Sequence, residues 1–157
     1  MDLLFVEDAI LCHCIDEATR WSTAVATPSK STGDLQNALV HGWFRIFGPH
    51  RTILSDSEGA LLSEDTAFFA KGWGVAIRAR PTGAHANIAE CHHEALRQTL
   101  HRLLTDARAE GIAAPVGHLA AEACFVKNAL TNVNGFTPFQ ASLGVIPLSC
   151  RILRTME

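Results

Sequence analysis

Short apolar runs separated by charged or turn-forming residues occupy the first part of the chain. Residues 2–6, 10–16 and 21–27 each have the length and the apolar or alternating character of a β-strand. The connection Glu7-Asp8 between the first two is too short for a crossover, so it predicts antiparallel neighbours. The chain is therefore predicted to open with three short strands.

A helical pattern follows the third strand. The turn-forming stretch 28–33 offers Ser31 or Thr32 as a helix N-cap, and Gly48-Pro49 provides a stop. Between them, apolar residues recur at helical spacing, which predicts one amphipathic helix with a single buried stripe. That stripe comprises Leu35, Leu39, Trp43 and Ile46.

Strands and helices alternate in the second half. Residues 51–55 and 75–79 predict two more strands, with a helix over roughly 61–72 between them that packs Leu62, Phe68 and Phe69 inward. Helical periodicity then predicts helices over 86–109 and 116–132, and Thr137-Pro138 begins a last one as N-cap and first-turn proline. This order predicts an α/β fold, a mixed five-stranded sheet flanked by helices.

Composition narrows the class of protein. A chain of 157 residues with 48% hydrophobic content predicts one domain, residues 1–157, with a substantial core. No apolar run reaches the ~18 residues of a membrane-spanning helix, and Met1-Asp2 does not begin a signal peptide. Five scattered cysteines, an odd number, favour reduced thiols in an intracellular setting.

Charge is unevenly distributed. The net charge is −3, which does not by itself indicate a nucleic-acid binder. Residues 71–102, however, hold five basic residues against two acids, together with four histidines. This stretch could present a positive face to a phosphate backbone, although ordinary surface charge would give the same count.

Three acids stand where a divalent cation could be bound. Asp2 begins the first apolar run, Asp56 follows the fourth, and Glu90 lies near the start of the long predicted helix. Carboxylates at a sheet edge, with one from a crossing helix, can hold two hard cations for phosphoryl transfer. The alternatives are a terminal polar residue for Asp2, a turn or N-cap for Asp56 and a surface carboxylate for Glu90.

Four further stretches, in order, carry a resemblance to the catalytic cores of retroviral and retrotransposon integrases. The third acid follows the second at roughly the distance of that family's Asp-Asp-Glu motif. The resemblance covers nearly the whole chain. It is carried by the V-D-x-x-S-R-like hairpin 15–21, the F-G-x-P…S-D-x-G-like stretch 47–56, the loop and glutamate 84–90, and the G-x-[ST]-P-F-x-x-x-x-G-like run 135–144.

The resemblance implies a ribonuclease-H-like fold and a DNA strand transferase. Asp2, Asp56 and Glu90 would hold two Mg²⁺ or Mn²⁺ ions for 3′-end processing and strand transfer in DNA integration. Element ends and target DNA would be the partners, with Arg97, His93 and Asn87 as candidate DNA contacts. A homodimer or higher oligomer, a nuclear location and no membrane association are implied as well.

Departures from the family pattern keep other functions open. Ser57-Glu58-Gly59 follows Asp56 where the family usually has Asn after the second acid, as D-N-G or D-x-G, and Cys91-His92-His93 stands where basic residues are common. Neither the family's N-terminal zinc module nor its C-terminal DNA-binding tail is recognisable, which suggests an N-terminally truncated core from a Pol polyprotein, or a decayed copy. The alternative function is a non-catalytic nucleic-acid-binding or dimerisation module. A ribonuclease-H-like nuclease is a third, but the fourth acid it usually needs has no convincing candidate.

Cys12-His13-Cys14 invites comparison with a zinc site. On a strand, successive side chains point to opposite faces, so the two cysteines lie on one side and His13 on the other. This alternation favours a pair of core cysteines over metal ligands.

Overall fold

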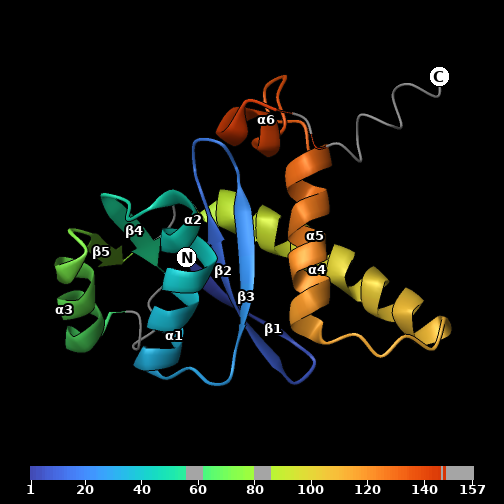
Figure 1. The fold of residues 1–157 in the computed structure, drawn as a ribbon, viewed down its shortest axis with the longest axis horizontal. Helices are drawn as coiled ribbons and strands as arrows, with labels where there is room; N and C mark the ends of the chain where they lie inside the picture. The colour runs from blue at the N-terminus through green and yellow to red at the C-terminus, as the bar shows by residue number, and fades with distance from the viewer. Residues whose placement is uncertain (56–61, 80–85, 146, 148–157) are drawn as a thin grey trace.

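Five strands and a set of helices make up the described part of the fold (Figure 1). The structure, a computed structural model, describes residues 1–55, 62–79, 86–145 and 147, and it describes no side chains at 86–89. Strands β1 (Asp2–Val6), β2 (Ala9–Ile15) and β3 (Ser22–Thr27) stand at the centre (Figure 1). On one side lie α4 (Ala86–Ala109) and α5 (Val116–Leu130), and on the other lie α1 (Thr32–Leu39), β4 (Thr52–Ser55), α3 (Glu64–Gly72) and β5 (Ala76–Ala79).

The central sheet is antiparallel, as the short connections predict. β1 (Asp2–Val6) pairs with β2 (Ala9–Ile15), and β2 pairs with β3 (Ser22–Thr27). The turn between β1 and β2 places Glu7 at φ 53°, in the left-handed region. This turn sets a register in which Asp2 lies directly opposite His13.

The remaining strands form a parallel pair. β4 (Thr52–Ser55) pairs with β5 (Ala76–Ala79). The predicted mix of antiparallel and parallel strands is confirmed, but the described strands divide into a three-stranded and a two-stranded sheet. A hydrogen bond of 2.8 Å from the Met1 amino group to the Leu54 carbonyl joins them.

The first helical segment contains an irregularity that the apolar spacing did not predict. α1 (Thr32–Leu39) is capped by the Ser31 side chain, then continues as a π-helical turn, η1 (Val40–Phe44), and ends as α2 (Arg45–Phe47). The wider turn shifts the buried face by about one residue. Phe44 is therefore buried, and the prediction for Ile46 is wrong, since its side chain is 58% exposed.

Gly42 lets this turn approach the sheet. A Cβ at this position would lie 2.4 Å from Val25 Cγ2 on β3, which is closer than real carbon contacts allow.

The helix α3 (Glu64–Gly72) buries a different face from the predicted one. Its N-cap, Ser63, starts it three residues later than expected. The buried positions are Thr66 and Ala70, one helical turn apart. The side chain of Phe68 is 82% exposed and that of Leu62 is 39% exposed, so the prediction that they pack inward is wrong. Phe69 is half-buried and packs against the core, as predicted.

The C-terminal helices agree with the sequence pattern. α4 (Ala86–Ala109) and α5 (Val116–Leu130) cover one face of the sheet, and α6 (Pro138–Leu143) begins at the predicted Thr137 with a full capping box. The core beneath α4 and α5 includes Leu4, Leu11, Leu96, Leu100 and Ala120.

A second core lies on the opposite face of the sheet. Cys12 and Cys14 are buried there with Leu35, Leu39 and Trp43, whereas His13 is on the α4 side. The prediction of core cysteines is therefore confirmed. Among the described residues, no helix is both long and apolar enough to cross a membrane.

Candidate active site around Asp2

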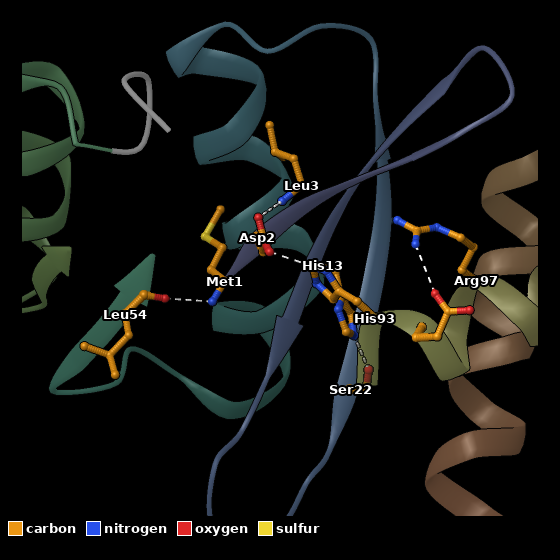
Figure 2. A network of polar contacts seen from close by, with 9 residues as sticks. Met1, Asp2, Leu3, His13, Ser22, Leu54, His93 and Arg97 are labelled. Carbon is orange, nitrogen blue, oxygen red and sulfur yellow. Dashed lines mark hydrogen bonds and ion pairs between the residues drawn. The ribbon is translucent and has the colours of Figure 1, made fainter. Parts of the chain in front are cut away.

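Asp2 occupies the first position of β1, at the edge where the two sheets meet. Its Oδ1 accepts a 2.8 Å hydrogen bond from the Leu3 backbone N–H, and its side chain is 19% exposed (Figure 2). The adjacent Met1 amino group is hydrogen-bonded to Leu54 of β4. The end of β4 therefore lies beside the start of β1, and it stops at Ser55, one residue before Asp56.

His93 brings the long helix to the same carboxylate. Its Nδ1 lies 3.3 Å from Asp2 Oδ2, and the imidazole is 13% exposed. The ring also packs against His13, with centroids 4.6 Å apart and planes tilted by 44°. In Figure 2 the three side chains converge between β1, β2 and α4. The carboxylate is thus held from its own strand and from a helix.

A buried polar chain continues behind His13. Its Nε2 and Ser22 Oγ are 2.5 Å apart. The Ser22 backbone N–H donates to Asn128 Oδ1 at 2.9 Å, and Asn128 Nδ2 donates back to the Ser22 carbonyl at 2.8 Å. These contacts connect β2, β3 and α5 in a nearly water-free environment, where each polar group needs its partner. We call this set of five residues the polar network: Asp2, His13, Ser22, His93 and Asn128.

Burial and positive neighbours favour neutral imidazoles here. Burial, more than the nearby His93, Lys127, amino terminus and His92, holds the pKa of His13 well below its usual range. Burial also lowers the pKa of His92 to about 4 and that of Lys127 to about 8. These shifts favour neutral rings at His13 and His92.

The other predicted metal ligands are placed only in part. Glu90 is exposed on α4, one turn before His93 and therefore on the same helical face. Asp56 lies outside the described residues. Within the described part of the chain, no group of three His, Cys, Asp or Glu side chains could hold a metal ion.

The candidate DNA contacts lie on α4. Arg97 Nη1 pairs with Glu94 Oε2 at 3.1 Å, and both side chains are about half exposed. Asn87 belongs to the helix, but its side chain is outside the described set. His93 reaches toward Asp2 rather than outward, so the structure places it at the predicted acid.

His13 is the site residue that sequence reasoning passed over. The signal was available, because a two-residue turn at Glu7-Asp8 pairs residue 2 with residue 13. The alternation of side chains predicted only that His13 faces away from the two cysteines. The register of the hairpin adds which residue lies across from it.

Comparison with solved structures identifies the fold. The catalytic core of BIV integrase superimposes with a TM-score of 0.77 at 14% identity, over 98% of this chain and 95% of that one. The chain has the fold of a retroviral integrase catalytic core. That fold is ribonuclease-H-like and α/β, so the predicted fold class and the resemblance are confirmed at this level.

Two other structures give the same result. The HTLV-2 integrase core, solved in complex with magnesium in trimeric and dimeric forms, matches with a TM-score of 0.71 at 15% identity, over 88% of each chain. A simian T-cell lymphotropic virus intasome, in complex with a PP2A regulatory subunit, matches with a TM-score of 0.75 at 15% identity. The match covers 92% of this chain and 54% of that one. No family model matches the sequence, and no curated protein matches it.

Proposed function

We propose that the chain is an integrase-type polynucleotidyl transferase that processes 3′ ends and joins them to target DNA. The observation that carries the proposal is the placement of Asp2. It stands at the start of a central strand, beside the end of β4, with α4 bringing His93 to its carboxylate. The integrase-core fold supports the same assignment.

The donor set suits a hard divalent cation. Asp2 offers carboxylate oxygens, and Glu90 lies on the helical face that carries His93. We assign Asp2, Asp56 and Glu90 as the ligands of two Mg²⁺ or Mn²⁺ ions. When bound, such ions would stabilise charge on phosphate oxygens and activate the attacking water or hydroxyl.

The chain's own residues would orient the ligand and the DNA. His93 contacts Asp2 Oδ2. The His93 ring packs against His13, which is held in turn by Ser22. Arg97, exposed on α4, would leave its ion pair with Glu94 and bind a phosphate oxygen of the DNA. Asn87, nearer the start of the helix, would be a second DNA contact. Self-association and a nuclear location belong to the same proposal.

A DNA joining assay with the purified chain tests the ligands. Asp2→Asn, Asp56→Asn and Glu90→Gln should each reduce strand transfer in Mg²⁺ or Mn²⁺ by at least about 100-fold while leaving the circular dichroism spectrum unchanged. The matched control is Glu94→Gln, four residues along the same helix. Activity at the unsubstituted level in Glu90→Gln would refute the assignment.

Metal titration by calorimetry separates the ligands from their supports. Asp2→Asn should abolish Mn²⁺ uptake at one site, whereas His93→Ala should weaken it by about 10–100-fold. His93→Asn, which keeps a hydrogen-bonding group, should recover part of the loss.

A non-catalytic DNA-binding or dimerisation module is the second candidate. Ser57-Glu58 in place of the usual Asn after the second acid favours it, because the added carboxylate of Glu58 alters the charge beside the proposed ligands. Absence of any Mg²⁺ or Mn²⁺ uptake, together with intact DNA binding, would decide for this module.

A further inference from the structure

A groove of about 350 Å³ lies between the end of β1 and the helix α4. Phe5 and Val6 both line it, although their side chains point to opposite faces of the sheet. A groove that contacts both residues must therefore open at an edge of the strand. In the described ladders β1 pairs with β2 alone, so this is the edge away from β2. The rest of the lining comprises Glu7, Glu94, Arg97, Gln98, His101 and Leu104.

The groove continues from the candidate active site along both of its walls. Phe5 comes three residues after Asp2 on β1, which corresponds to about 10 Å of strand. Arg97 comes seven residues after Glu90 on α4, which is again about 10 Å. One strand of stacked DNA advances about 3.4 Å per nucleotide, so this distance corresponds to about three nucleotides. A strand held at the proposed ligands would therefore reach the groove.

Phe5 presents an aromatic ring at this edge. Its side chain is 47% exposed, whereas its neighbours on the strand, Leu4 and Val6, are buried. The Nζ of Lys30 lies 4.4 Å from the centre of the Phe5 ring, where the ring's quadrupole attracts a cation. Proteins bind unpaired bases on such rings, with cations nearby to contact the phosphates.

Linked polar side chains form the helix wall. Glu94 Oε2 accepts a hydrogen bond from Arg97 Nη1 at 3.1 Å, and its Oε1 accepts one from Gln98 Nε2 at 2.9 Å. The other acid of the lining, Glu7, forms an ion pair with Arg108. Each acid of the groove is thus offset by an arginine. Donors and acceptors are both available there for the edge of a base.

We propose that the groove binds one unpaired nucleotide of the DNA, with its base stacked on Phe5 and its phosphate on Arg97. The base must be unpaired, because within a duplex its two faces are covered by the neighbouring bases. Stacking does not depend on base identity, so the groove would favour single-stranded over duplex DNA without a strong sequence preference. That the partner is DNA rests on the proposed function.

Fluorescence anisotropy with a labelled ten-nucleotide single strand and a blunt duplex of the same length tests the proposal. Phe5→Leu keeps an apolar side chain but removes the ring, so it should weaken single-strand binding by about 5–100-fold and change duplex binding by less than about twofold. Phe5→Trp should retain single-strand binding. The matched control is Phe68→Leu on α3, which removes a ring that is 82% exposed and should alter neither affinity.

Equal single-strand affinity in Phe5→Leu and the original chain would overturn the proposal. So would an equal loss for single strand and duplex in Phe5→Leu, since stacking on an unpaired base cannot affect the duplex. The DNA joining assay separates this inference from the catalytic one. Joining together with Phe5-independent binding would refute only the groove, and Phe5-dependent binding without joining would refute only the transferase. A chain that binds neither DNA would refute both.

Discussion

The two faces of the β1–β2–β3 sheet are built by neighbouring residues of the same strands, yet they differ in chemistry. Cys12 and Cys14 face an apolar core with Trp43, whereas His13, between them, faces Asp2, His93 and Ser22. On the apolar face the contacts are non-directional and roughly additive with buried area. On the polar face each group depends on a particular partner. The face toward α4 has an apolar core of its own, so both faces contribute stability, and its polar network adds a fixed arrangement near Asp2.

The largest loss of stability should come from the apolar face. Trp43→Ala removes a side chain that is only 5% exposed, so we expect a loss of about 3–5 kcal/mol in the free energy of unfolding, measured by urea denaturation. Ile46→Ala, on the exposed side of the same helical segment, should cost no more than about 0.5 kcal/mol. Similar losses in the two variants would mean that the π-helical turn does not set the buried face.

Asn128→Ala should disrupt the polar network and lower the free energy of unfolding by an intermediate amount. Its amide exchanges two hydrogen bonds with the backbone of Ser22, both buried. Leaving those groups without partners should cost about 1–3 kcal/mol. The same denaturation experiment measures this, and Asn128→Asp, which keeps the acceptor but loses the donors, should not restore full stability.

The pH dependence of stability isolates His13. Because its folded pKa is lowered, its contribution is complete above the ordinary value of about 6.5 and is lost as pH falls toward the folded pKa. The groups around it are His92 and His93 on α4, Lys127 on α5, the Met1 amino group and Asp2. His13→Gln should flatten the fall in unfolding free energy below pH 6.5. An unchanged slope would assign the effect to another group.

The smallest effect on stability should come from Arg97. Its ion pair with Glu94 is exposed, so Arg97→Gln should change the free energy of unfolding by less than about 0.5 kcal/mol. If Arg97 contacts phosphate, the same variant should weaken DNA binding and reduce the slope of log K against log salt by about 1. Glu94→Gln is the matched control, and it should not weaken binding.

Local patterns predicted most of the fold. The three hairpin strands, the long helix α4 and the Thr137 cap could be predicted, because each depends on neighbours in sequence. Which face is buried could not be predicted for α3 or for the helical segment that contains η1. Phe68 has the hydrophobicity of a core residue, but α3 begins at Glu64 and turns it outward, and the π-helical turn does the same to Ile46. Such changes in which side chains of a helix are buried depend on tertiary packing.

The candidate site was predictable in outline only. Asp2 could be singled out because it begins an apolar run and, with Asp56 and Glu90, follows the order and spacing of the family's three acids. The contact of His93 with Asp2 depends on the crossing of α4 over β1, which no local spacing encodes. The polar network depends further on Asn128, more than a hundred residues from Ser22.

The tight turn at Glu7-Asp8 has a consequence far from its own position. Strand side chains alternate with a period of two, so one added residue in this surface loop would turn either β1 or β2 over. His13 would then exchange places with a cysteine, and Asp2 would lose the imidazole across from it. Loop length, commonly regarded as free to vary, is here a determinant of which chemistry the sheet presents.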